Sequence, residues 1–259
     1  MKTLVLVAVA VCLLSLTVCG GGGGNGNSTS SLLTGNWQAS LKNSTTNAVK
    51  SESGFIIQSG NFLSGNVLLT GSTACAGVGS AQGQLSGLNV AIAVSQVGQT
   101  VNLMGTASSD GSTMSGNYTI LASPCGNSQV GTWTATQVHA LTGSFQATFT
   151  STKTTGLVFH FGGKIAQGPN NGGSTTTLAG NMTSTDAPCF STASITGQIS
   201  GTAIVFNLLS SEGVPLGQYS GTATTDATMI TGGYNLQPQS ASNSGCRDFG
   251  TAKVSVQPS

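Results

Sequence analysis

The sequence predicts an all-β protein built from two tandem antiparallel eight-stranded barrel-like modules. Three observations support this fold class. Neutral polar residues alternate with Val, Ile, Leu and Ala, no helical period of useful length follows Cys19, and several segments occur twice in the same order. Thr and Val favour strands, and Gly and Asn favour the turns between them.

An internal repeat defines the two modules. LTGNWQASL returns later in the chain as LTGSFQATF, and GTASSDGSTMSGNYTI returns as GTATTDATMITGGYNL. We therefore expect residues 32–138 and 139–259 to be two copies of one module, each long enough to bury a modest core.

Each copy is expected to contain eight short strands. In the first copy the alternation and the turn residues place them at 35–41, 53–58, 64–70, 79–85, 88–95, 100–107, 114–121 and 131–138. Eight hairpin-linked strands favour an up-and-down barrel, which leaves no exposed sheet edge. A two-sheet sandwich and one sixteen-stranded barrel shared by both copies are the alternatives.

The Gly35-x-Trp37 opening of the first copy resembles the first strand of lipocalins and avidins. The resemblance implies a barrel and covers one strand, so no ligand of those families is carried over to this chain.

The first nineteen residues are typical of an export signal. Lys2 precedes an apolar run at 4–14, which is too short to span a membrane as a helix of roughly 20 residues. Leu16, Thr17, Val18 and Cys19 then resemble a bacterial lipobox, although Val18 stands where such motifs usually have a small residue. The resemblance implies cleavage before Cys19 and acylation of its sulfur. An ordinary signal peptide cut near the following glycines is the alternative.

A tether follows the expected lipidation site. Residues 20–31, GGGGGNGNSTSS, have no apolar side chain and would span roughly 20 Å as a flexible coil. Acyl chains on Cys19 would then hold the protein on a lipid bilayer. Gly20 in place of Asp after the cysteine indicates the outer membrane of the bacterial envelope.

The composition excludes one class of partner. Charged residues make up 5% of the chain, and the net charge is +1. A nucleic-acid-binding surface needs a basic patch, so no nucleic-acid partner is expected.

No catalytic or metal site is evident in the sequence. The acidic residues are Glu52, Asp110, Asp186, Glu212, Asp226 and Asp248. They form no local pair of the kind that general acid–base work favours, and Asp110 and Asp226 lie in predicted turns. His139 and His160 lack metal-ligand spacing, and no G-x-S-x-G motif occurs. We therefore expect no metal, no cofactor and no enzymatic activity.

Four cysteines lie beyond the tether, at repeated positions. In an exported protein such a set predicts disulfides, and the repeat favours Cys75 with Cys125 and Cys189 with Cys246. Free buried thiols and pairing between the copies are the alternatives.

One tryptophan has no aromatic counterpart in the repeat. Trp37 corresponds to Phe145 and is expected in the core, whereas Trp133 corresponds to Ala252. Trp133 is therefore either a stacking platform for a sugar or lipid ligand in the first module or a plug of the barrel interior.

These observations favour a non-enzymatic envelope lipoprotein that binds a small apolar or glycan ligand in a β module. A surface protein acting through protein contacts and a hydrolase assembled only on folding are the alternatives. An internal cavity above about 300 Å³ would favour ligand binding, and a filled core with an exposed apolar patch would favour protein contacts.

Overall fold

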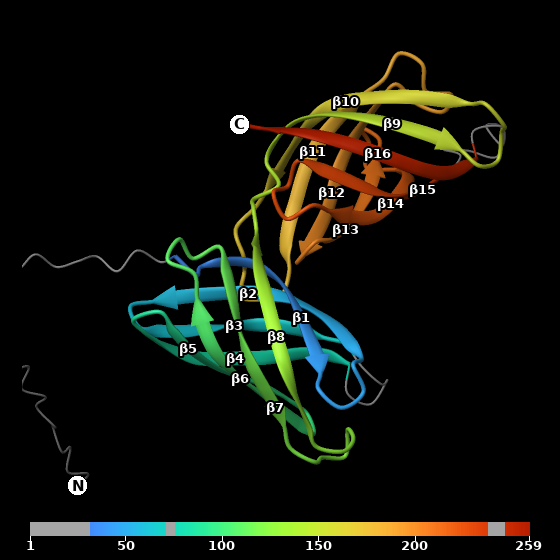
Figure 1. Cartoon of the computed structure of the whole chain (residues 1–259). Helices are drawn as coiled ribbons and strands as arrows, with labels where there is room; N and C mark the ends of the chain where they lie inside the picture. Colours follow the sequence, from blue (N-terminus) through green and yellow to red (C-terminus); the bar gives the residue numbers. More distant parts are fainter. Residues whose placement is uncertain (1–31, 71–75, 238–246) are drawn as a thin grey trace, which may run out of the picture.

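The computed structural model describes residues 32–70, 76–237 and 247–259, and it confirms the predicted fold class. All its regular elements are β-strands, and they form two closed eight-stranded barrels (Figure 1). None of the described residues belongs to a helix long and apolar enough to cross a membrane.

The strands of the first barrel are β1 (Gly35–Asn43), β2 (Val49–Ser59), β3 (Phe62–Leu69), β4 (Gly77–Ser86), β5 (Asn89–Gln96), β6 (Gln99–Ala107), β7 (Thr113–Ile120) and β8 (Gln129–Val138). The strands of the second barrel are β9 (Gly143–Ser151), β10 (Val158–Gln167), β11 (Thr176–Thr183), β12 (Thr192–Ser200), β13 (Ala203–Leu209), β14 (Pro215–Ala223), β15 (Met229–Leu236) and β16 (Asp248–Pro258).

Each barrel closes within its own copy of the repeat. Consecutive strands pair antiparallel, and the last strand of each copy returns to the first, so that β8 pairs with β1 and β16 pairs with β9. No strand is shared between the copies among the described residues. The sandwich and the shared sixteen-stranded barrel are therefore excluded.

The alternation of side chains explains why these segments form barrel walls. Along β9 every second residue is buried, beginning with Gly143, and the residues between them are exposed. Because successive side chains of a strand point to opposite faces, Phe145, Ala147 and Phe149 enter the interior. The buried apolar residues accordingly form one cluster in each barrel.

The connections of each barrel lie at two ends. We call one of them the cysteine end, because Cys125 and Cys189 lie in its connections. In the first barrel the described residues of these connections are 44–48, 70, 76, 97–98 and 121–128. In the second barrel they are 152–157, 184–191, 210–214, 237 and 247.

The two barrels abut directly. Residues 139–142 join β8 to β9, and the His139 N–H donates to Thr225 O at 2.8 Å. The end of β12 and the turn that follows it contact β1 and β2 through several hydrogen bonds, including one between Ser53 Oγ and Ser200 Oγ at 2.8 Å. Figure 1 shows this end of the second barrel set against the side of the first.

Candidate ligand site in the first barrel

The inward face of β2 carries two charged residues near the cysteine end. Lys50, Glu52, Gly54 and Ile56 share this face because they are two residues apart. Lys50 is half-buried, whereas only 4% of Glu52 is exposed. An acidic side chain is rarely buried to this extent unless it has a partner.

Glu52 has its hydrogen-bond partner at the end of β3. The Thr70 N–H donates to Glu52 Oε2 at 2.5 Å, and the Thr70 hydroxyl lies 3.4 Å from Glu52 Oε1. Burial removes water from the carboxyl and raises its pKa from 4.5 to about 7, against the opposing effects of the Thr70 hydrogen bonds and the Lys50 charge. The side chain can therefore gain or lose a proton near neutral pH.

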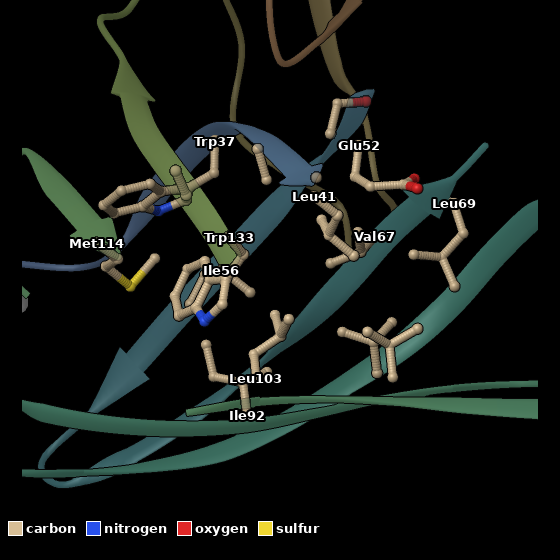
Figure 2. A pocket seen from close by; sticks show the side chains of 16 residues that line it. Trp37, Leu41, Glu52, Ile56, Val67, Leu69, Ile92, Leu103, Met114 and Trp133 are labelled. Carbon is tan, nitrogen blue, oxygen red and sulfur yellow. The ribbon is translucent and has the colours of Figure 1, made fainter. Parts of the chain in front are cut away.

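Glu52 lines an internal cavity of about 50 Å³. Apart from Glu52 and Ser53, the residues around this space are apolar or glycine, and they include both tryptophans of the chain. Figure 2 shows Glu52 and Trp133 among the side chains that surround it. A single water needs roughly 10–15 Å³, and an engineered cavity of roughly 150 Å³ binds benzene. A guest larger than a few waters therefore requires the lining side chains to move.

The second barrel is more tightly filled, with a cavity of about 20 Å³. Neither cavity reaches the 300 Å³ expected of a preformed small-molecule site. The cysteine end of the second barrel is closed by a cluster of aromatic rings, which we call the aromatic plug. Its members are Phe149, Phe159, Phe161, Phe190 and Tyr234, with ring centroids 4.8–5.9 Å apart in the contacting pairs.

The strand registers show what replaces the aromatic plug in the first barrel. Leu41 pairs with Lys50 as Phe149 pairs with Phe159. In the same two ladders, Ala39 pairs with Glu52 as Ala147 pairs with Phe161. The first barrel thus carries Lys50 and Glu52 where the second carries two phenylalanines.

Two further positions complete this comparison. Tyr118 pairs with Gly131 as Tyr234 pairs with Gly250, so the tyrosine is common to both barrels. Ala76 follows Cys75 in the sequence, whereas Phe190 follows Cys189. The tyrosine is therefore the one aromatic position of the plug that the first barrel shares.

Trp133 lies inside the first barrel and is 1% exposed. Its indole N–H donates to Met104 O at 3.3 Å, and its ring borders the cavity. Trp37 borders the same cavity and donates to Leu33 O at 3.0 Å. Contact of Trp133 with a ligand remains a prediction, and the only place for it is the barrel interior.

The remaining acidic residues lie apart from this site. Asp110 and Asp226 cap equivalent turns: Asp110 accepts from the Ser112 N–H at 3.0 Å, and Asp226 accepts from the Thr228 N–H at 3.1 Å. Ser108 and Ser112 hydrogen bonds lower the pKa of Asp110 to about 2.

His160 and Asp186 are hydrogen-bonded on the exposed surface of the second barrel, with Nδ1 and Oδ2 2.8 Å apart. The hydrogen bonds from His160 lower the pKa of Asp186 to about 2. Asp248 is buried and accepts hydrogen bonds from Ser151 Oγ at 2.6 Å and from Tyr234 OH at 2.8 Å. In the described part of the chain, no three His, Cys, Asp or Glu side chains gather as metal ligands.

The lipidation and disulfide predictions fall partly outside the described residues. Cys19, Cys75 and Cys246 lie outside them. Cys125 is in the connection between β7 and β8, and Cys189 is in the connection between β11 and β12. The two proposed pairs would join corresponding connections at the cysteine end of each barrel, and they remain predictions.

Comparison with known proteins gives no family. No protein-family model matches the chain, and no curated protein matches it. Among solved structures, the chain is similar to kievitone hydratase from Nectria haematococca, with a TM-score of 0.25 and 9% identity over 87% of this chain and 90% of that chain.

This finding contradicts the expectation that the protein is not an enzyme, because the matched protein is named as one. At a TM-score this low, no substrate and no site residue is carried over to the present chain. The buried carboxyl of Glu52 is an acid–base candidate that the sequence alone did not indicate.

Proposed function

We propose that the protein is a lipid-anchored component of the bacterial cell envelope whose first barrel binds a small, mainly apolar molecule. One observation carries the binding proposal: Glu52 faces an apolar cavity in the first barrel, whereas Phe161 fills the equivalent position of the second. Burial raises the pKa of the Glu52 carboxyl even with its Thr70 hydrogen bonds, so ionising it there costs free energy. Its place beside a cavity therefore supports a functional use.

The chemistry of the cavity indicates the kind of ligand. The Glu52 carboxylate can accept a hydrogen bond, and the surrounding side chains offer apolar contact. A compact hydrocarbon body with one hydroxyl or amine group satisfies both. The second barrel, with its aromatic plug, would then act as a support for the first.

Cyclohexanol is a suitable probe, and methylcyclohexane is its match without a hydroxyl. Both tryptophans of the chain border the cavity, so changes in intrinsic tryptophan fluorescence report on this barrel. We expect saturable binding of cyclohexanol that is tighter than binding of methylcyclohexane, because only the alcohol can donate to Glu52.

Three variants sharpen this test. Glu52→Leu should remove the preference for the alcohol, and Glu212→Gln, at an exposed acid of the second barrel, should keep it. Leu69→Ala should enlarge the cavity and strengthen binding of both probes, although it also costs about 2–5 kcal/mol of stability. Absence of binding to both the wild type and the Leu69→Ala variant would rule out the proposed ligand site.

The envelope location has its own test. Expressed in a bacterium, the wild type should fractionate with membranes, and Cys19→Ala should move the protein to the soluble or uncleaved pool. A mutant that partitions like the wild type would exclude the anchor at Cys19.

A second candidate function is proton transfer to a bound molecule. It is favoured by the pKa of Glu52, because a group that titrates near pH 7 can act as a general base or acid at neutral pH. The test uses cyclohexanone in deuterated water. Glu52 would remove an α-proton, leaving the electron pair in the enolate, would exchange that proton for deuterium with solvent, and would return the deuterium to carbon. Exchange should therefore be faster than in buffer and should fall to the buffer rate in Glu52→Gln. Equal exchange rates in both proteins would exclude this role.

A further inference from the structure

The turn between β12 and β13 holds the outer side of the wall that carries Glu52. Asn36 on β1 is buried there, and it exchanges two hydrogen bonds with Gly201: Asn36 Nδ2 donates to Gly201 O at 2.7 Å, and the Gly201 N–H donates to Asn36 Oδ1 at 2.7 Å. A reciprocal pair of this kind fixes both the position and the orientation of the turn.

A second pair of contacts reaches the backbone of Glu52 itself. The Thr202 N–H and hydroxyl both donate to Gln38 Oε1, each at 3.1 Å. The Nε2 group of Gln38 then donates to Glu52 O at 2.9 Å and to Ser51 Oγ at 2.8 Å. The amide of Gln38 thus connects the second barrel to the main chain of Glu52.

The neighbour of Glu52 on the outer face is also held. Ser53 Oγ and Ser200 Oγ are 2.8 Å apart, and Ser200 Oγ donates to Ser174 O at 3.0 Å. Because side chains alternate along β2, Ser53 contacts the second barrel while Glu52 points into the first. A direct contact at Ser53, and an indirect one through Gln38 to Ser51 and Glu52, therefore hold the backbone from which the Glu52 side chain projects.

We propose that the second barrel is a positioning clamp for Glu52, with Gln38 as the positioning residue that connects the turn at Gly201 and Thr202 to the Glu52 main chain. The clamp concerns the same site as the proposed ligand binding, and its consequence for ligand affinity rests on that function. The clamp itself is a statement about Glu52 and can be tested without a ligand.

The surroundings of Glu52 make its titration a measure of the clamp. Lys50, on the same face of β2, is the charged group whose field acts on it. From β1, β3, β5, β6, β7 and β8, the side chains that line the cavity are apolar. If the wall moves, water reaches the carboxyl, and the desolvation that raises its pKa weakens.

Gly201 provides a variant that acts on the contact. Its φ angle is +56°, and an added Cβ would collide with Gln38 and Ser53 of the first barrel. Gly213 in the turn between β13 and β14 provides the matched control, because its φ is +77° and an added Cβ would meet open space. Gly201→Ala and Gly213→Ala carry similar local backbone strain, and they differ in the contact with the first barrel.

The experiment follows the carboxyl carbon signals of ¹³C-glutamate in the intact two-barrel protein as the pH is changed. The chain contains two glutamates, Glu52 and Glu212, so Glu212→Gln assigns the signals. We expect Gly201→Ala to shift the midpoint of the Glu52 titration from near pH 7 toward pH 4.5. Gly213→Ala should leave this titration midpoint in place. Equal midpoints in the two variants would overturn the clamp.

A gentler pair of variants keeps the test decisive if Gly201→Ala fails to fold. Gln38→Met removes the connecting amide without changing a turn, and Gln218→Met is its match at an exposed glutamine of β14. The first should shift the Glu52 midpoint in the same direction, and the second should not. A Glu52 midpoint unmoved by Gln38→Met would contradict the role of Gln38.

Cyclohexanol binding separates this proposal from the proposed function. A wild type that does not bind the probe but whose Glu52 midpoint responds to Gly201→Ala would support the clamp and refute the ligand site. A wild type that binds the probe but whose Glu52 midpoint does not respond to Gly201→Ala would support the ligand site and refute the clamp.

Discussion

At position 52 the two copies of the module differ in kind. Phe161 is buried within the aromatic plug of the second barrel. Glu52, at the equivalent place in the first barrel, keeps two hydrogen-bond contacts with Thr70. Replacing a buried ionisable group by an apolar one of similar size often stabilises a protein. We therefore expect the ionised carboxyl of Glu52 to lower stability at neutral pH. The second barrel, which has a phenylalanine at the equivalent position, shows that an apolar side chain fits there.

The pH dependence of stability should reveal this cost. The pKa of Glu52 rises from 4.5 to about 7 on folding, so below pH 4.5 the carboxyl is protonated in both states. As the pH rises toward 7, the unfolded chain loses its proton first, and stability falls by up to roughly 3 kcal/mol. Glu52→Gln should match the wild type near pH 4 and be more stable by up to that amount at pH 8, as measured by urea unfolding.

The difference between the two proteins isolates Glu52 from other titrating groups. Asp110 and Asp186, whose pKa values are lowered to about 2, are present in both. Glu212→Gln, at an exposed acid of the second barrel, is the control for the loss of a carboxyl. A constant difference between Glu52→Gln and the wild type would show that Glu52 is ionised at its ordinary pKa.

The candidate site could have been predicted only in part. Both tryptophans were identified, and the repeat contained the decisive comparison, since Glu52 aligns with Phe161. The expected strand began at residue 53, whereas β2 begins at Val49. The polar run Lys-Ser-Glu-Ser does not alternate with apolar residues, so nothing local indicated that Glu52 points inward. Its burial follows from barrel closure, which no single strand reveals.

At the scale of the elements, the expected strands of the first barrel are confirmed, with ends shifted by at most two residues except at β2, which begins four residues earlier. This agreement has a physical cause: each wall has a buried face and an exposed face, so a period of two is written into most strands. The sequence indicates less clearly which neighbouring strands approach each other most closely. Gly105 on β6 faces Gly116 on β7, and Gly221 faces Gly232 in the second barrel.

Gly116→Ala tests how tightly these walls approach. An added Cβ would collide with Met104 O and the Gly105 Cα, and such overpacking costs about 1–3 kcal/mol. Ser115→Ala, at the adjacent exposed position, should change stability by less than about 0.5 kcal/mol. The unfolding midpoint in urea measures both. A Gly116→Ala protein as stable as the Ser115→Ala protein would mean that β6 and β7 can separate at little cost.

At the scale of the whole molecule, each barrel closes by itself, and a separate contact joins the two barrels. Each barrel satisfies its backbone hydrogen bonds within one copy and has its own apolar core. The contact between the barrels is mainly polar: the hydrogen bonds around Gly201 are joined by one from Asn66 Nδ2 to Gly172 O. A polar contact is typical of an interface between domains that fold separately. Val138 is the exception to this separation, because it ends β8 yet packs against the core of the second barrel.

The two halves should therefore fold alone. We expect fragments 32–138 and 138–259, each including Val138, to be soluble under oxidising conditions and to unfold cooperatively on heating, because neither leaves an open sheet edge. Circular dichroism would follow the loss of β structure. Fragments that aggregate separately but recover on mixing would contradict two independent barrels.

The first fragment also lacks the turn that holds Gln38, so its Glu52 midpoint should fall as in Gly201→Ala. Adding the second fragment should restore the midpoint if the polar contact reforms between separate chains, which makes the clamp measurable as a binding reaction.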